Sequence, residues 1–144
     1  MTGPFSVDAS VFLNAFIPSE KGSDISREVL ARLQTQSVPI IAPYLLLPET
    51  AAAISRGQNN PEFARQFSLN LEHFPHLVLI PLDNGLARQA LEIAAFYRLR
   101  GSDAVYAAVA QRFACPLITL DKEQHDRITA VVSTYYPEEL LSEL

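Results

Sequence analysis

Short apolar runs alternate along the chain with longer stretches in which apolar residues recur at helical spacing. The apolar runs predict strands at residues 5–7, 39–42, 77–80 and 116–120, with a last candidate at 130–132. Between them, helical spacing and helix-start residues predict helices over residues 11–16, 43–54, 61–74, 83–101, 103–114, 122–127 and 138–144, and another that begins at Ser23. This alternation predicts an α/β fold, a three-layer α/β/α sandwich around a mostly parallel central sheet.

A turn around Gly101 separates two of the predicted helices. Gly101 can adopt the left-handed conformation that closes a helix, and Ser102 is a good N-cap for the next one. Asp103 then falls in the first helical turn, where the helix dipole favours a negative charge. The residues that follow are small or apolar, so we expect this helix to be buried.

Two further helix starts carry candidate chemistry. Ser10 is expected to cap the first helix, directly after Asp8. Pro43 suits the first turn of the helix over residues 43–54, which places Pro48 inside that helix and predicts a kink near Tyr44. Glu49 follows the kink among apolar neighbours and is therefore expected to point inward.

Composition limits the classes of protein that the chain can belong to. A chain of 144 residues is expected to form a single domain over residues 1–144 with one sizeable core. Hydrophobic residues make up 49% and charged residues 19%, which predicts a folded rather than a disordered chain. The formal net charge is -5 without a basic tail, which argues against a protein that coats nucleic acid non-specifically.

Cysteine usage and hydropathy bear on the compartment. Cys115 is the only cysteine, so we expect neither an intrachain disulfide nor a cysteine zinc cluster, and a reducing cytoplasm fits. No apolar stretch approaches the ~20 residues of a membrane span, and the N-terminus lacks the pattern of a signal peptide. The sequence therefore predicts a cytoplasmic protein without a membrane segment.

Several common site patterns are absent from the sequence. The glycines do not form a phosphate-binding loop, and no Gly-x-Ser-x-Gly elbow occurs. His73 and His76 fall in a predicted loop and are expected to be partly exposed. His125 lies close to Asp121 in sequence, and both a position in a site and a solvated position remain open.

Four acidic residues stand at positions that a parallel sheet would bring together. Asp8 and Asp121 end predicted strands, Asp103 begins a buried helix, and Glu49 follows the predicted kink, whereas Asp126 is a weaker candidate. Each acid taken singly is explained by helix capping or a solvated surface. Together in one pocket they would repel one another unless a cation lay among them. Oxygen ligands select Mg²⁺ or Mn²⁺, which predicts a metal site suited to phosphate chemistry.

The chain resembles the PIN-domain family, and most closely its VapC-like toxin ribonucleases. The resemblance rests on pieces whose order and spacing span nearly the whole chain: Val7-Asp8-Ala9-Ser10-Val11, Leu47-Pro48-Glu49, Arg100-Gly101-Ser102-Asp103-Ala104-Val105-Tyr106 and Ile118-Thr119-Leu120-Asp121. The resemblance implies an acidic site made of Asp8, Glu49, Asp103 and Asp121. It also implies a PIN-like fold, a parallel sheet sandwiched by helices.

The resemblance also implies a mechanism. Mg²⁺ or Mn²⁺ held by Asp8, Asp103 and Asp121 would activate a water that attacks an RNA phosphodiester in line, leaving a 5′-phosphate and a 3′-hydroxyl. Glu49 would position the metal or its water. Ser10 and Thr119 match positions where the family often places a hydroxyl that orients a carboxylate or water.

Further expectations concern partners and substrate. Arg100 and Lys122 adjoin the motif acids and are the leading candidates for RNA contacts among the basic residues. The resemblance implies the toxin of a type II toxin–antitoxin pair, with an antitoxin partner and a homodimer. Phe63, Phe67, Leu71 and Phe74 are expected on one helix face, either as core or as a partner surface.

Two other functions remain open from sequence. A PIN-like module could bind RNA or protein without cutting, although such a module would not need all four acids. A small metal-dependent phosphohydrolase could use the same acid geometry on nucleotide monophosphates. Cleavage of single-stranded RNA with and without metal separates the nuclease from the binding module, and an assay on nucleotide monophosphates tests the phosphohydrolase.

Overall fold

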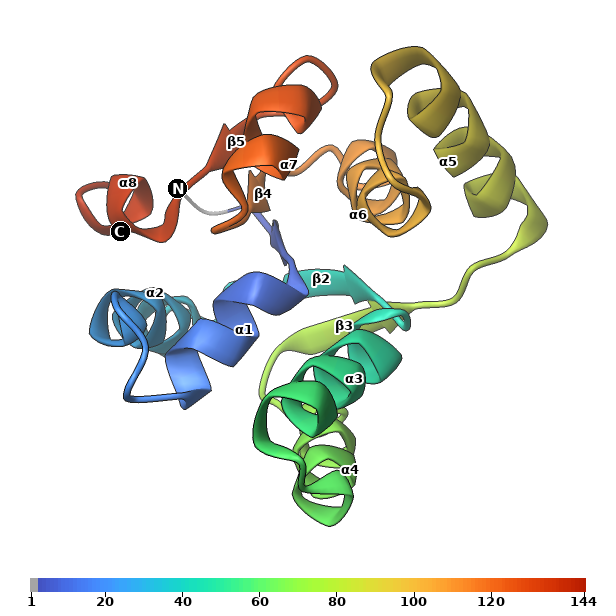
Figure 1. Ribbon diagram of the computed structural model, residues 1–144. Helices are drawn as coiled ribbons and strands as arrows, with labels where there is room; N and C mark the ends of the chain where they lie inside the picture. The colour runs from blue at the N-terminus through green and yellow to red at the C-terminus, as the bar shows by residue number, and fades with distance from the viewer. Residues whose placement is uncertain (1–2) are drawn as a thin grey trace.

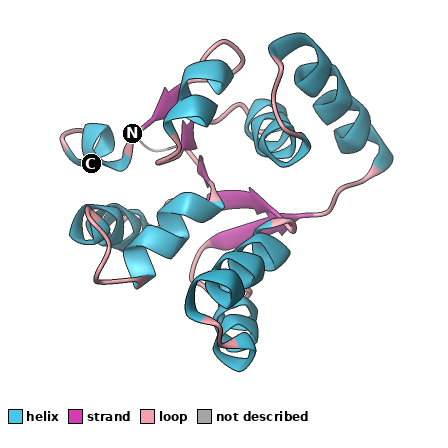
Figure 2. Cartoon of the chain, in the orientation of Figure 1, coloured by secondary structure: helices cyan, strands magenta, loops and turns pink. Residues whose placement is uncertain are grey.

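A five-stranded sheet forms the centre of the structure, a computed structural model that describes residues 3–144. Neighbouring strands all pair in parallel, in the order β3-β2-β1-β4-β5. The strands are β1 (Phe5–Val7), β2 (Ile40–Pro43), β3 (Leu77–Ile80), β4 (Leu117–Ile118) and β5 (Thr134–Tyr135). Figure 2 shows the strands in the middle of the molecule with helices around them.

Helices cover both faces of this sheet. They are α1 (Ala9–Phe16), α2 (Ser23–Thr35), α3 (Leu46–Gln58), α4 (Pro61–Leu71), α5 (Asn84–Tyr97), α6 (Gly101–Arg112), α7 (Lys122–Ile128) and α8 (Pro137–Leu141). In Figure 1, α5 and α6 lie on one side of the sheet and α1 and α2 on the other, which confirms the predicted α/β/α sandwich. No helix among the described residues is long and apolar enough to cross a lipid bilayer.

The core lies on both faces of the central strands, against α6 on one face and against α1 and α2 on the other. All residues of β1 and β2 are buried, as is typical of parallel strands covered on both faces. Ala104, Ala107 and Ala108 of α6 are fully buried, and α6 contacts β1, β2 and β4. Small side chains let this helix approach the sheet closely, which fixes the position of its first turn.

The prediction of a strand at residues 130–132 is wrong. These residues form the turn after α7, where the N–H groups of Val131 and Val132 both donate to the carbonyl of Ile128. The strand instead comprises Thr134 and Tyr135, which pair with Leu117 and Ile118 of β4. Val131 and Val132 pack against the core from the turn, so their apolar character reflects burial rather than strand pairing.

The predicted kink at Pro48 is also absent. Pro43 ends β2 rather than beginning a helix, and α3 starts at Leu46. Pro48 is therefore the third residue of α3, where a backbone N–H has no partner within the helix and its loss costs nothing. Glu49 consequently lies in the first turn of a regular helix.

Two of the predicted helix caps are replaced by neighbouring residues. Gly101 does not have a positive φ; the left-handed residue is Arg98, with a φ of 55°, which ends α5. The N-cap of α6 is Arg100 rather than Ser102, and Ser102 lies inside the helix. Asp103 does lie in the first turn, as predicted.

The first helix also begins earlier than predicted. Its N-cap is Asp8, whose side chain accepts a hydrogen bond from the backbone N–H of Ser10. The aspartate has the stronger acceptor, so it displaces Ser10 from the capping role. Similarly, α4 ends at Leu71, which leaves Phe74 in the following turn rather than on the helix.

Candidate active site

Two acids lie at the carboxyl edge of the sheet, next to each other in strand order. Asp8 directly follows β1 and caps α1, whereas Asp121 follows β4 and caps α7 through the N–H of Gln124. Because β1 and β4 are parallel neighbours, both acids lie at the same edge. The capping geometry turns each chain sharply after its strand, and this holds the carboxylates at the edge.

Asp8 is buried and has partners on both carboxylate oxygens. Oδ1 accepts hydrogen bonds from the N–H and the hydroxyl of Ser10, and Oδ2 accepts one from Oγ1 of Thr119 at 2.6 Å. Asp8 is only 4% exposed, and this burial raises its pKa to about 6. The hydrogen bonds offset only part of the cost of burying the charge.

Thr119 connects Asp8 to α7. Its Oγ1 accepts the backbone N–H of Asp121 at 3.1 Å and lies 2.9 Å from the side-chain amide of Gln124, which is buried. A hydroxyl has one proton to donate, so donation to Asp8 requires that Gln124 present its NH₂ group to Thr119. Thr119 therefore orients the carboxylate of Asp8 through its proton and holds the backbone N–H of Asp121 through a lone pair.

Arg100 joins the two remaining aspartates of the edge. Its Nε donates to Oδ2 of Asp103 at 3.0 Å, and its terminal nitrogen lies 3.3 Å from Oδ2 of Asp121. Burial raises the pKa of Asp103, although Arg100 and its hydrogen bond oppose that rise. The guanidinium supplies the positive charge that two adjacent carboxylates need.

Glu49 faces the same region from α3. Burial raises the pKa of Glu49, a nearby hydroxyl of Tyr106 opposes this, and the charge of Asp103 raises it further. Oε1 of Glu49 and the hydroxyl oxygen of Tyr106 are both buried, yet neither has a hydrogen-bond partner of good geometry. Burial and the charges of Glu49 and Asp8 also raise the pKa of Tyr106 well above its usual value, so its hydroxyl stays protonated.

The donor set of this edge fits a hard divalent cation. All of its candidate ligands are carboxylate or hydroxyl oxygens, and one buried carboxylate oxygen, Oε1 of Glu49, has no partner. Among the residues that the structure describes, no three Asp, Glu, His or Cys side chains converge closely enough to hold a metal as they stand. Mg²⁺ typically takes only one or two carboxylates and keeps several waters, which suits carboxylates spaced in this way.

Other residues singled out from sequence lie outside this cluster. Lys122 is exposed on α7 next to Asp121. His125 stacks on Tyr136 with ring centroids 4.1 Å apart and lies 3.2 Å from the carboxylate of the exposed Asp126. Both of the other histidines, His73 and His76, are exposed in the loop before β3, as predicted.

A groove of about 440 Å³ begins beside the acids and runs between α1 and α3. Ser10 and Glu49 line it, and Ala52, Ala53 and Arg56 continue its α3 wall. Arg56 is seven residues beyond Glu49, which places it about 10 Å further along the helix axis. Arg56 is exposed and forms no ion pair with any described residue.

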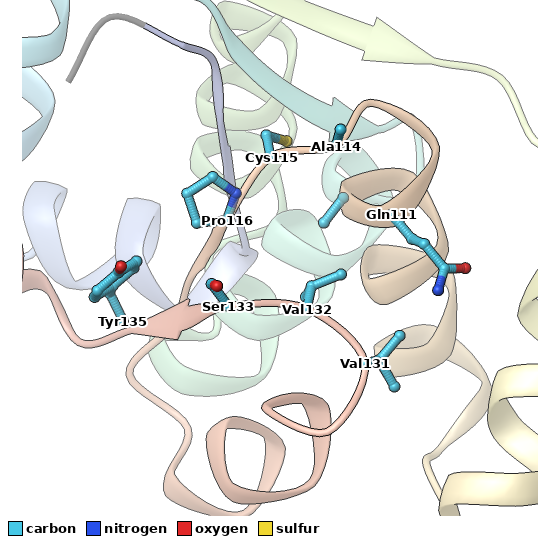
Figure 3. A pocket seen from close by; sticks show the side chains of 9 residues that line it. Gln111, Ala114, Cys115, Pro116, Val131, Val132, Ser133 and Tyr135 are labelled. Atoms are coloured by element: carbon cyan, nitrogen blue, oxygen red, sulfur yellow. The ribbon is translucent and has the colours of Figure 1, made fainter.

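A second pocket, also about 440 Å³, lies away from the acids (Figure 3). Its lining comes from the end of α6 and from the segments that lead into β4 and β5, at the amino edge of the sheet, and it includes Gln111, Cys115, Val132 and Ser133. Burial raises the pKa of the Cys115 thiol to about 11, so the thiol is unreactive at neutral pH.

Two residues at the acidic edge were not assigned a role from sequence. Tyr106 lies three positions after Asp103, a spacing that places both on the same side of α6. Gln124 lies three positions after the N-cap Asp121, the spacing of a capping box. These spacings are the only signals in the sequence that could have pointed to the two residues. The distant groups that their side chains approach are set by the fold.

Comparison with known proteins identifies the family. The model of the PIN domain matches residues 6–130, and the chain therefore belongs to the PIN-domain family. None of the curated proteins compared with the chain matches it.

Several solved structures share the fold. VapBC2 from Rickettsia felis, solved with a DNA fragment from its promoter, has a TM-score of 0.70 at 15% identity and covers 92% of this chain and 97% of its own. VapC20 from Mycobacterium tuberculosis, a toxin that cleaves the sarcin-ricin loop, has a TM-score of 0.69 at 16% identity, covering 83% and 92%. A toxin–antitoxin complex from Klebsiella pneumoniae gives 0.66 at 15% identity, covering 92% and 96%.

Proposed function

We propose that this PIN-domain protein is a metal-dependent endoribonuclease of the cytoplasm and the toxin of a type II toxin–antitoxin pair. The observation that best supports this proposal is the acidic edge, where four carboxylates from separate parts of the chain lie around one end of the sheet. Burial raises the pKa values of Glu49 and Asp103, and the charge of Asp103 raises that of Glu49 further. Arg100 links Asp103 to Asp121. A merely structural edge would not retain so many half-buried acids.

Within this proposal, Asp8, Asp103 and Asp121 hold Mg²⁺ or Mn²⁺. When bound, the cation neutralises charge on the phosphodiester and lowers the pKa of a coordinated water. Glu49, from α3, would position the metal or its water. Ser10 and Thr119 fix the carboxylate of Asp8 through hydrogen bonds to its two oxygens.

The groove between α1 and α3 accommodates the RNA strand that flanks the cleaved bond. It begins at Ser10 and Glu49, so a strand lying in it has one phosphate at the acids. Arg56 then meets a phosphate further along the same strand. Arg100 and Lys122 contact the backbone on the other side of the acids, which keeps the RNA contact small and local on a protein of net charge -5.

The partners follow from the same proposal. A second chain, the antitoxin, holds the toxin inactive; one neighbour of the same fold is a toxin–antitoxin complex. The protein itself forms a homodimer. The side chains of Leu91 and Phe96 support this, because these α5 residues are 62% and 77% exposed and apolar.

One cleavage experiment tests the proposal. The purified protein is incubated with single-stranded RNA in Mg²⁺ or Mn²⁺, and again after addition of EDTA. We expect fragments with 5′-phosphate and 3′-hydroxyl ends that appear only with metal. Nucleotide monophosphates are assayed in parallel, and release of phosphate from them without RNA cleavage would assign the site to a phosphohydrolase instead.

A second candidate function is a PIN-like module that binds RNA or protein without cutting. The pairing of Arg100 with Asp103 and Asp121 favours it, because the guanidinium offsets part of the negative charge of these two acids without any metal. RNA binding that is unaffected by EDTA, with no cleavage of any RNA tested, would select this alternative.

A further inference from the structure

The hydroxyl of Tyr106 is a deeply buried polar group near the acids that no proposed role yet uses. The residue is 1% exposed, and its hydroxyl oxygen has no hydrogen-bond partner of good geometry, although the carboxylate of Glu49 and the backbone N–H of Ala9 lie near it. Its neighbours on α6 are mostly alanine and valine, so a phenylalanine ring would fill the same space. Burying a hydroxyl without a partner is costly, which means that a purely structural tyrosine would be a poor choice here.

The missing partner lies across from it on α3. Oε1 of Glu49 is likewise buried and unpartnered, and the hydroxyl of Tyr106 and the carboxylate of Glu49 lie near each other. Two unpartnered buried groups, one a donor and one an acceptor, satisfy each other directly after a small rotation or through one shared water. Glu49 also lines the groove, so its carboxylate stands between Tyr106 and the open side of the site.

We infer that Tyr106 is a positioning residue, whose hydroxyl donates to Oε1 of Glu49 and so fixes the carboxylate in the orientation that the site needs. The effect of Tyr106 on catalysis rests on the proposed function. The Tyr106–Glu49 contact itself does not depend on that function. Asp103 lies in the first turn of α6, three residues before Tyr106, so the same buried helix sets the positions of Asp103 and of the group that orients Glu49.

The test is Tyr106→Phe, which removes one oxygen and keeps the ring. We expect kcat for RNA cleavage to fall about 10- to 100-fold while KM changes by less than about twofold, because the group acts on Glu49 and not on RNA. The dissociation constant for Mn²⁺ alone, measured by calorimetry, should rise by about the same factor as kcat falls. Tyr97→Phe on the exposed end of α5 is the matched control and should change neither quantity.

A double-mutant cycle with Glu49→Ala shows whether Tyr106 acts through Glu49. In the Glu49→Ala background, Tyr106→Phe should have no further effect on Mn²⁺ affinity. Additive effects, or an unchanged Mn²⁺ affinity in the single variant, would overturn the inference.

The melting temperature of the metal-free proteins gives a readout that does not need the proposed nuclease. We expect the shifts caused by Tyr106→Phe and Glu49→Ala to be non-additive. Coupling here without any Mn²⁺ binding would keep the Tyr106–Glu49 contact and reject the nuclease. Additive shifts with intact cleavage would reject the Tyr106–Glu49 contact and keep the nuclease.

Discussion

Oγ1 of Thr119 lies 2.6 Å from Oδ2 of Asp8, although 111 positions separate the two residues in the chain. The contact joins the segment after β4 to the end of β1, and Ser10 holds the other oxygen of the same carboxylate. The hydroxyl of Ser10 also accepts the N–H of Leu120 at 3.0 Å. The hydroxyl groups of Thr119 and Ser10 therefore each link the end of β1 to the segment after β4. The orientation of Asp8 therefore depends on the same bonds that close the edge of the sheet.

Thr119→Val tests this linkage, because valine keeps the shape and removes the hydroxyl. The change leaves Oδ2 of Asp8 and the N–H of Asp121 without their partner, and we expect the free energy of unfolding to fall by about 1–3 kcal/mol. Chemical denaturation at pH 7 measures it. Thr119→Ser keeps the hydroxyl and should recover most of the loss; equal stability of the valine variant and the parent protein would contradict the linkage.

The burial of Asp8 predicts an unusual pH dependence. Its pKa rises from the ordinary 3.8 to about 6 in the folded protein, so between these values the folded chain holds a proton that the unfolded chain releases. The stability contributed by Asp8 is full below pH 3.8 and is lost as pH rises to about 6. The loss amounts to about 3 kcal/mol.

Asp8→Asn removes this titration and is expected to stabilise the metal-free protein at pH 7, by up to about 3 kcal/mol, with little effect near pH 4. Asparagine keeps the acceptor that caps α1, and its NH₂ can donate to Thr119, which then donates to Gln124. Urea denaturation in EDTA from pH 4 to 7 measures the difference between the two proteins. A difference that does not change with pH would rule out the raised pKa.

Asp103→Asn separates catalysis from folding at the start of α6. We expect metal-dependent RNA cleavage to fall by at least about 100-fold, because a neutral amide is a poor ligand for a hard cation. The helix loses only a dipole contribution of about 0.3–1 kcal/mol, so circular dichroism should show an intact fold. Asp126→Asn, an exposed acid that pairs with His125, is the control and should cleave normally; full activity of the Asp103 variant would remove Asp103 from the site.

Most of the fold was predictable because β1 to β4 are apolar runs between clear helix signals. Errors arose where one local pattern fits two structures. The apolar residues 130–132 suit a buried turn as well as a strand, and Pro48 is harmless in a first turn but disruptive one turn later. For Pro48, the outcome depends on the residue at which α3 starts, and only the fold determines that residue.

The candidate site was predictable as a set of strand-end and helix-start acids, but its connections were not. The sequence placed Arg100 beside Asp103, and only the fold brings it within 3.3 Å of Asp121, which lies 21 positions away. The contacts of Gln124 and Tyr106 likewise depend on how α7, α6 and α3 pack. The metal-binding and catalytic roles of the acids stay predictions.

The bridge made by Arg100 predicts competition with metal. Arg100→Gln removes a cation that now pairs with Asp103 and Asp121 and offsets part of their charge, so we expect Mn²⁺ to bind the variant more tightly. The side chain of Arg100 is 70% exposed, which limits the gain to about two- to fivefold. Calorimetry without RNA measures it. Arg127→Gln, which breaks an exposed pair with Glu123, is the control; unchanged or weaker Mn²⁺ binding in the Arg100 variant would show that the bridge does not compete.

Arg56→Gln tests the path of RNA along the groove. If Arg56 meets a phosphate of the bound strand, its loss should raise KM several-fold with little change in kcat, because the contact is the same in the ground state and the transition state. The dependence of log affinity on log salt should become shallower by about 0.7, the value for one phosphate of a single strand. Arg65→Gln on α4 removes another exposed arginine, one that already pairs with Glu62, and it should leave both quantities unchanged. An identical salt dependence for the Arg56 variant and the parent protein would place the RNA strand outside the groove.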